Sequence, residues 1–168
     1  TPVKLMRDEW EKFLDKGDYL LEIHIPRGDD FGMGAIKDSY LHAKEFYRRY
    51  FPEIDYKGMF CHTWLFTPQL QEMLPRSSKI VAFQRQFYLY PTKGSVNYLW
   101  NFVFNELTER KDAKPDTYLR KKVLEYLDED KEIFDMRGIF LDIGNEFGGT
   151  SYMDKYDAGE YSFLHDAE

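Results

Sequence analysis

The sequence predicts one α/β (α+β) domain, in which a mixed central sheet is flanked by helices. Stretches with helical apolar spacing and stretches with strand-like alternation follow one another roughly in the order α-β-α-β-α-β-β-α-β. The chain has 168 residues, of which 43% are hydrophobic and 18% are aromatic. This length and composition suit a single domain with a full hydrophobic core rather than a disordered chain.

The first third of the chain alternates between helical and strand-like patterns. Apolar residues between positions 6 and 14 fall on one helical face, and a strand is expected over 19–26. Residues 27–34 read as a glycine-rich loop. Residues 35–50 have the spacing of an amphipathic helix, which stops before Pro52.

The middle third contains most of the predicted sheet. An aromatic and β-branched run at 60–66 predicts a strand that leads into a short helix at 69–74. Residues 80–90 predict a long strand with Gln84 on its polar face. Residues 96–104 fit either a strand or a helix, and the dominance of aromatic residues favours a strand.

The last third holds one helix and one strand. Asp116 can cap a helix in which Leu119 and Val123 face inward, and residues 137–143 predict a strand. Residues 144–168 are rich in glycine, aspartate and tyrosine, and we expect an irregular tail.

We expect residues 1–168 to form a single domain, because the chain has no internal repeat and no clear linker. It begins with Thr1 and Pro2 rather than with methionine, which predicts a processed chain or a piece of a longer protein. Residues 1–17 are then an N-terminal helix or a linker from a missing N-terminal domain.

Charge and composition argue against several classes of partner. The formal net charge of −7 disfavours bulk attraction to nucleic acid or to an anionic membrane. No signal peptide and no apolar run of membrane-spanning length is found in the sequence. Cys61 is the single cysteine, which excludes an intrachain disulfide and fits a reducing compartment. We therefore expect a cytoplasmic protein without nucleic-acid or membrane partners.

Seven short segments, taken together, carry a resemblance to a known family. They are LEIHIP at 21–26, CHTWL at 61–65, PQL at 68–70, LP at 74–75, FQR at 83–85, FVF at 102–104 and LRKKVL at 119–124. In these segments the chain resembles the GNAT-like C-terminal domain of bacterial two-domain acyltransferases. The resemblance covers roughly residues 18–142.

The resemblance implies a GNAT-type sheet that is largely antiparallel, and an activity that moves an acyl group from a CoA thioester to an amine. Acetyl-CoA or another acyl-CoA would be the cosubstrate, with no tightly bound cofactor. The implied partners are a small-molecule amine substrate and the helical N-terminal domain that members of this family carry.

The resemblance also predicts where CoA would bind. In GNAT enzymes a central strand lies beside the pantetheine arm, and the pyrophosphate rests on backbone amides at the start of the next helix. If residues 98–104 are that strand, the phosphates contact residues 105–120. The candidate cofactor-binding residues there are Arg110, Lys111, Lys114, Thr117 and Arg120. The usual Gln/Arg-x-x-Gly-x-Gly/Ala pattern is missing, since residues 106–115 contain no glycine.

Four polar residues on predicted strands are candidate catalytic residues: Glu22, His24, His62 and Gln84. If their strands are neighbours in a suitable register, they share one face of the sheet. A positioned imidazole could then remove a proton from an attacking amine, with Glu22 orienting it. The alternative is that each histidine makes structural hydrogen bonds alone.

Other arrangements favour structure over chemistry. Cys61 and His62 are adjacent on a strand and point to opposite faces, so we expect a buried, slowly reacting thiol rather than a nucleophile. The histidines lack the short spacing of zinc ligands, and we predict no metal site. The loop at 27–34 contains Gly-x-Gly but misses the dinucleotide and P-loop patterns, which indicates a connector or a substrate-side loop.

Two functions of different classes remain. The first is an acyl-CoA-dependent N-acyltransferase in which His24 or His62 is the general base. The second is a catalytically silent GNAT-like module that binds a ligand or a partner. The missing glycine pattern favours the silent module, whereas the strand histidines favour the enzyme.

Overall fold

A mixed sheet forms the centre of the domain. The structure, a computed structural model, describes residues 6–8, 11–26, 28, 31–92, 98–105, 107–141 and 146–159. Within them the sheet has the strand order β1-β2-β4-β3. Its strands are β1 (Tyr19–Glu22), β2 (Tyr56–His62), β3 (Tyr88–Pro91) and β4 (Met136–Leu141). Strand β1 runs parallel to β2, and β4 is antiparallel to both β2 and β3. The predicted mixed, largely antiparallel sheet is confirmed.

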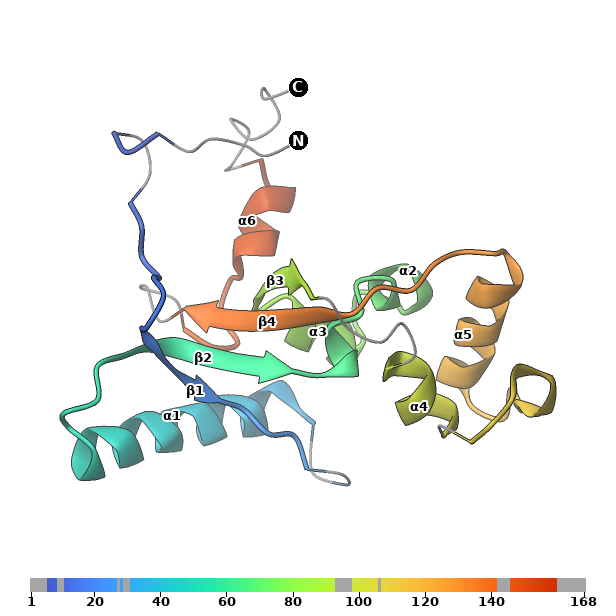
Figure 1. The fold of residues 1–168 in the computed structure, drawn as a ribbon, viewed down its shortest axis with the longest axis horizontal. Helices are drawn as coiled ribbons and strands as arrows, with labels where there is room; N and C mark the ends of the chain where they lie inside the picture. Colours follow the sequence, from blue (N-terminus) through green and yellow to red (C-terminus); the bar gives the residue numbers. More distant parts are fainter. Residues whose placement is uncertain are drawn as a thin grey trace.

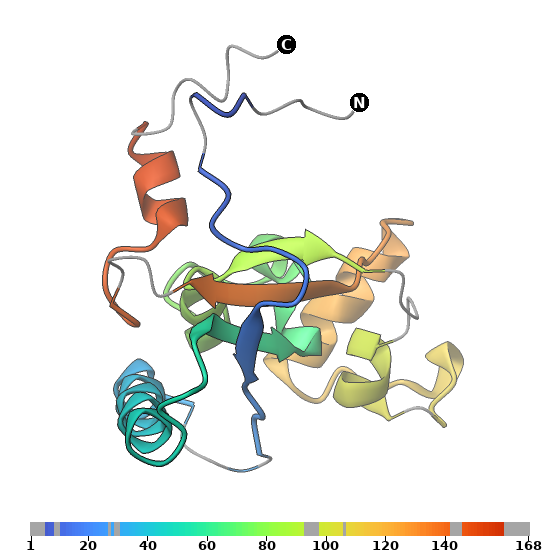
Figure 2. The ribbon, with the colours of Figure 1, turned by 60° about the vertical axis from the view of Figure 1, so that its left-hand side comes forward.

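Helices flank this sheet, as expected. They are α1 (Met33–Tyr50), α2 (Leu70–Met73), α3 (Lys79–Gln84), α4 (Tyr98–Phe104), α5 (Tyr118–Asp128) and α6 (Tyr152–Asp157), with 3-10 turns η1 (Trp64–Phe66) and η2 (Arg110–Asp112). Figures 1 and 2 show α1 beside β1 and β2, α6 near β3 and β4, and α4 with α5 beyond the end of the sheet. None of the helices among the described residues has an apolar stretch that could cross a bilayer.

One core cluster fills the space between the sheet and helices α1 and α3. It is dominated by phenylalanine, and the rings of Phe66 and Phe83 stack 5.4 Å apart. Its buried members are Tyr40, Met59, Cys61, Phe66, Phe83, Phe87, Phe140 and Phe147. Aromatic side chains bury a large apolar area each, so this cluster is the main source of stability for the sheet.

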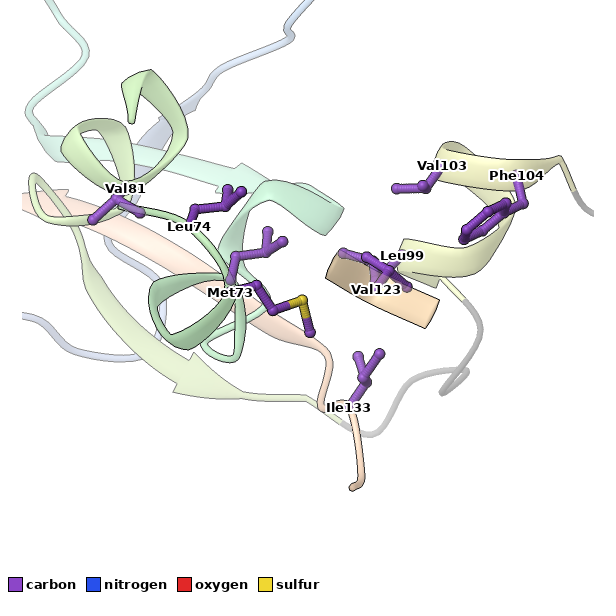
Figure 3. Close-up of a cluster of buried hydrophobic side chains, with 9 residues drawn as sticks. Met73, Leu74, Val81, Leu99, Val103, Phe104, Val123 and Ile133 are labelled. Carbon is purple, nitrogen blue, oxygen red and sulfur yellow. The ribbon is translucent and has the colours of Figure 1, made fainter. Parts of the chain in front are cut away.

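A second cluster holds α4 and α5 together. Leu99 and Val103 of α4 point toward Val123 of α5, while Met73 at the end of α2 and the following Leu74 belong to the same cluster (Figure 3). Val123 is fully buried. The inward positions of α5 therefore agree with the sequence prediction for this helix.

Gly138 allows the 3-10 turn η1 to pack flat against β4. A Cβ atom at this position would lie 2.6 Å from the ring of Phe66 and 3.0 Å from Cβ of Phe87. Real Cβ atoms do not approach ring carbons so closely, which means that only glycine fits without movement of the core.

The prediction of one long strand over 80–90 is wrong. Residues 79–84 form α3, and the strand β3 begins only at Tyr88. Ser78 caps the helix, because its side-chain oxygen accepts a hydrogen bond from the amide of Ile80. Buried residues at 80–87 fit helical as well as strand spacing, and the cap decides between them.

The strand preferred for residues 96–104 is also wrong, since Tyr98–Phe104 is α4. Leu99 and Val103 lie four residues apart and are both buried, which satisfies the helical period. The strand expected over 60–66 ends at His62. There Thr63 caps η1 by accepting a hydrogen bond from the amide of Leu65.

The C-terminal end of the chain differs from expectation, whereas the N-terminal end is compatible with the linker that is one of the two alternatives. The described residues between 6 and 18 form turns and no helix, and Trp10 lies outside them. The tail expected to be irregular contains α6, which starts with a reciprocal capping box between Ser151 and Asp154. The buried Arg85 anchors this helix by ion pairs of 2.7 Å to both Asp154 and Asp157. Burial alone would raise the pKa of Asp154, but hydrogen bonds from Arg85 and Ser151 outweigh it and hold that pKa well below its usual range.

Replacement of Gly138 by alanine tests the close contact with Phe66. We expect Gly138→Ala to lower the free energy of unfolding by about 1–3 kcal/mol, because the added methyl group overpacks the core. Urea denaturation measures this change. Gly34→Ala is the matched control, since no atom lies within 4 Å of its Cβ position. An unchanged unfolding midpoint for Gly138→Ala would contradict the packing described here.

Candidate functional site

The sheet has one buried face and one accessible face. On β2, Met59 and Cys61 point into the phenylalanine-rich core, so Phe60 and His62 point the opposite way. The strand register aligns the same face across the sheet, because paired residues share a side. We call this surface the open sheet face; it consists of Glu22, Phe60, His62, Tyr88, Tyr90, Arg137 and Ile139.

Glu22 and His24 lie together at the end of β1. Glu22 pairs with Phe60 in the parallel ladder, and the amide of Ile23 continues the ladder by donating to the carbonyl of Phe60 over 2.8 Å. Nε2 of His24 is 3.9 Å from Oε2 of Glu22, and the His24 side chain is 87% exposed. This separation is longer than a hydrogen bond and both side chains are exposed, so the carboxylate lies near the imidazole without fixing its orientation.

His62 is on the same face, two residues beyond the partner of Glu22 on β2. Its ring stacks on Tyr98 of α4, with the ring centres 5.2 Å apart and the planes 12° from parallel. Tyr98 in turn meets Phe102 edge to face, and Phe102 stacks on Trp64. His62 thus sits where the open sheet face meets an aromatic surface built by α4 and η1.

Gln84 does not join the histidines, which corrects the proposal of four residues on one face. It lies in the last turn of α3 and is fully buried. Its Nε2 donates to the carbonyl oxygens of Leu65 at 2.6 Å and Thr67 at 2.8 Å. These bonds tie α3 to η1, so Gln84 is a structural residue.

Two residues near His62 were missed in the sequence. Burial raises the pKa of Asp135, and the nearby His62 opposes this increase. Arg137 is the direct partner of His62 in the antiparallel ladder. A signal for Arg137 existed, since it is the one charged residue in the strand sequence MRGIFL.

The predicted CoA region has a different structure from the one assumed. The prediction required Tyr98–Phe104 to be a strand, and it is a helix. The residues proposed to bind phosphate lie on η2 and at the start of α5, on the part of the chain that Figure 1 shows beyond the end of the sheet. The structural premise of that assignment is therefore wrong, although the five residues themselves stay a prediction.

Most of those five residues already have partners. Arg110 is 2.6 Å from Asp128, Lys111 is 2.8 Å from Glu109, and Arg120 binds both Asp116 and the carbonyl of Val103. Oγ1 of Thr117 accepts a hydrogen bond from the amide of Arg120 and caps α5. Lys114 is exposed. Phosphate binding here would have to compete with carboxylates that neutralise these cations.

A strand, a glycine-containing loop and a helix do follow one another elsewhere, from β1 to α1. Gly32 precedes the first turn of α1 in an extended conformation without a side-chain cap. The first turn has no acidic residue, and the space around the Cβ position of Gly34 is open to 4 Å. The start of this 18-residue helix therefore offers backbone amides and the positive end of the helix dipole.

A groove lies at one end of the sheet. This open groove of about 410 Å³ lies where the end of β3 and the start of β4 meet Pro68, and its lining includes Thr92, Phe134 and Asp135. None of the four predicted catalytic residues lines it. Among the described residues, no three His, Cys, Asp or Glu side chains are grouped so that they could hold a metal ion.

Cys61 is buried, as predicted, with 1% of its surface exposed. Burial and the negative charge of Glu22 raise the pKa of the thiol to about 12. Since the thiolate is the reactive form, the cysteine is unsuited to act as a nucleophile at neutral pH.

Thiol labelling tests this assignment. We expect native protein at pH 8 to react with an aromatic disulfide reagent roughly a hundredfold or more slowly than protein unfolded in urea, because a raised pKa lowers the thiolate fraction. The native rate should still increase between pH 8 and pH 10, whereas the rate of an ordinary thiol levels off above its pKa of about 8.5. Rapid native labelling at pH 8 would show that Cys61 is accessible and ionised.

Comparison with known proteins places this geometry in context. The family model described as the GNAT-like C-terminal domain matches residues 3–140. A crystal structure of an acyltransferase in complex with decanoyl-CoA superposes with a TM-score of 0.66 at 26% identity, covering 76% of this chain and 42% of that one. An acyltransferase in complex with CoA and 10C-teicoplanin gives 0.64 at 22% identity, covering 73% and 40%. An acyltransferase variant with octanoyl-CoA gives 0.63 at 21% identity, covering 71% and 40%.

The chain thus spans about two fifths of the length of these solved acyltransferases. The search of curated protein sequences found no match.

Proposed function

The chain belongs to the family of GNAT-like C-terminal domains, and from this membership we propose that it is the C-terminal domain of an acyl-CoA-dependent N-acyltransferase. The observation that carries the proposal is the shared fold with acyltransferases crystallised with decanoyl-CoA or octanoyl-CoA. Acyl-CoA would be an exchangeable cosubstrate, and the acceptor a small-molecule amine.

The partner domain and the cellular location are part of this proposal. The matched part of this chain covers about two fifths of those acyltransferases, which leaves room for the helical N-terminal domain implied by the family resemblance. We propose that this domain covers part of the active site. We also propose a bacterial, cytoplasmic protein, in agreement with the single unpaired cysteine.

We propose that CoA binds between β1 and the start of α1, in place of the region at 105–120. The loop from β1 to α1 ends in Gly32-Met33-Gly34, which matches the Gly-x-Gly part of the GNAT phosphate pattern, while Asp29 stands where the pattern has Gln or Arg. The amides in the first turn of α1 would receive the pyrophosphate. The strand before the loop would supply a backbone amide for the oxyanion of the thioester.

The reaction requires a base and a leaving group. The amine nitrogen attacks the thioester carbonyl, the new C–N bond forms, and the C–S bond breaks to release CoA. His24 or His62 would take the proton that the amine loses, and the released thiolate of CoA would take up a proton in turn. Glu22 is the acidic residue near His24 and would have to move closer to orient it, whereas Asp135 is the acidic residue near His62.

A silent, ligand-binding module remains the second candidate. It is favoured by the carboxylates that already pair with Arg110, Lys111 and Arg120, and by the two acidic residues, Asp29 and Asp30, in the loop before α1. Acyl-CoA binding by the full-length protein, followed by assays for transfer to amines, separates this module from an enzyme.

The two possible CoA positions can be distinguished with a single added charge. We expect Gly34→Asp to weaken acyl-CoA binding by the full-length protein about tenfold or more, because the new carboxylate opposes phosphate at the start of α1. Isothermal titration with decanoyl-CoA measures the dissociation constant. Gly34→Asn is the matched neutral control, and an acidic residue in the first helical turn does not by itself destabilise the helix.

If CoA binds at residues 105–120 instead, the two sets of variants should have the opposite effects on affinity. Joint replacement of Arg110, Lys111 and Lys114 by alanine should then weaken binding and reduce its salt dependence, while Gly34→Asp leaves it unchanged. Absence of decanoyl-CoA binding in the unmodified full-length protein would favour the silent module.

The role of the histidines is tested separately. A general base typically contributes about 10²–10⁴-fold to turnover, so we expect either His24→Gln or His62→Gln to lower kcat by that order without changing the melting temperature. The decrease of kcat at low pH, which reports protonation of the base, should disappear from the pH profile of the remaining activity. Reduced thermal stability with normal kcat in both variants would show that the histidines are structural.

A further inference from the structure

Arg137 is a charged residue at the centre of the open sheet face. It lies on β4, with His62 of β2 as its partner on one side and Tyr90 of β3 on the other. Its side chain is half-buried, while Gly138 and Phe140 on the other face of β4 are fully buried. The guanidinium is thus held on the sheet surface beside the candidate general base.

The guanidinium of Arg137 has no anionic partner among the residues that the structure describes. Arg85 and Arg120, which are also partly withdrawn from solvent, each bind carboxylates. Arg137 makes no such ion pair, and its Nε is buried without a hydrogen-bond partner. Its guanidinium lies over the ring of Phe60, 5.8 Å from the ring centre. A buried N–H without an acceptor is costly, and a ligand that supplies one gains the corresponding energy.

The geometry of an arginine side chain favours one kind of ligand. Its planar fork of N–H groups matches the two oxygens of a carboxylate. Directly paired residues in an antiparallel ladder have Cβ atoms about 4.5–5.5 Å apart, so a ligand bound to Arg137 reaches His62 easily. Phe60 and Tyr90 supply apolar and aromatic surface around the cation.

We propose that Arg137 binds a carboxylate of the acceptor, and that the acceptor is an amine that carries a carboxylate, such as an amino acid. This inference rests on the proposed function, because it assigns the acceptor class of that reaction. The carboxylate anchors the acceptor on β4, and its amine faces the histidines at the ends of β1 and β2. Arg137 is therefore a residue that determines acceptor specificity and takes no proton in the reaction.

The test uses a pair of probes that differ at the carboxyl group, L-phenylalanine and L-phenylalaninamide. In the full-length protein, the Nε–H resonance of Arg137 should move on addition of L-phenylalanine and should stay in place with the amide. Arg137→Gln should abolish the binding of L-phenylalanine. Arg48→Gln should retain it, because Arg48 pairs with Glu45 on the exposed surface of α1.

Activity gives a second readout in a panel of carboxylate and carboxamide amines. Arg137→Gln should lower kcat/KM for the carboxylate members about tenfold or more and leave the carboxamide members unchanged. Arg137→Lys keeps the charge but lacks the planar fork of N–H groups. Its kcat/KM for the carboxylate members should therefore fall between those of the unmodified protein and Arg137→Gln.

Several outcomes would overturn the inference. Equal responses to both probes, or no response to either, would exclude a carboxylate site at Arg137. An Nε–H resonance that is already shifted in the full-length protein, and insensitive to both probes, would show that another part of the protein supplies the partner of Arg137. Loss of decanoyl-CoA affinity in Arg137→Gln would assign the arginine to CoA instead.

The proposed function has a test that is independent of Arg137: absence of decanoyl-CoA binding in the unmodified full-length protein would contradict it. Decanoyl-CoA binding with no preference for carboxylate amines leaves the proposed function standing and overturns the inference alone.

Discussion

The antiparallel pairing of β2 with β4 is the constraint on which the rest of the structure depends. Residues 58–62 pair with residues 137–141, so the side chains of both strands alternate in step between the two faces. One face sends Cys61 and Phe140 into the core, and the other presents His62 and Arg137. A slip by one residue would exchange the faces and bury the charged groups, which makes this register strongly determined. The buried thiol and the accessible histidine are consequences of the same alternation.

Close packing behind the sheet holds this arrangement in place. Phe66 rests on Gly138 because no Cβ intervenes, and Gln84 ties the last turn of α3 to the carbonyl groups around η1. The segment that follows His62 is therefore anchored by hydrogen bonds and by ring packing within a few residues of the histidine. A functional group on a strand end that is supported in this way keeps its position better than one on a free loop.

The open sheet face and the start of α1 supply different chemistry. The helix start offers backbone amides and a positive dipole, which suit the phosphates of a nucleotide. The open sheet face and the neighbouring His24 offer two imidazoles, aromatic rings and a guanidinium without an anionic partner among the described residues, which suit an amine with an anionic group. In the proposed acyltransferase, CoA would bind at the helix start, the acceptor amine would bind at the open sheet face, and the thioester would lie between them. The two carboxylates, Glu22 and Asp135, lie near the two candidate bases, His24 and His62.

The sequence by itself determined the fold class, the helices α1 and α5, the strand cores at β1, β2 and β4, and the burial of Cys61, since each depends on local periodicity. It also placed Glu22, His24 and His62 on strands, and the structure puts Glu22 and His62 at strand ends and His24 just beyond one. Only the tertiary structure decided that Gln84 is a buried structural amide and that Tyr98–Phe104 is a helix. Apolar residues in those segments fit both the helical and the strand period. The Ser78 cap favours the helix in the segment of Gln84, and packing against Val123 favours the helix at Tyr98–Phe104. The pairing of β2 with β4 brings Arg137 and the nearby Asp135 next to His62, although more than seventy residues separate them from it along the chain. Periodicity along the chain does not encode such a long-range contact.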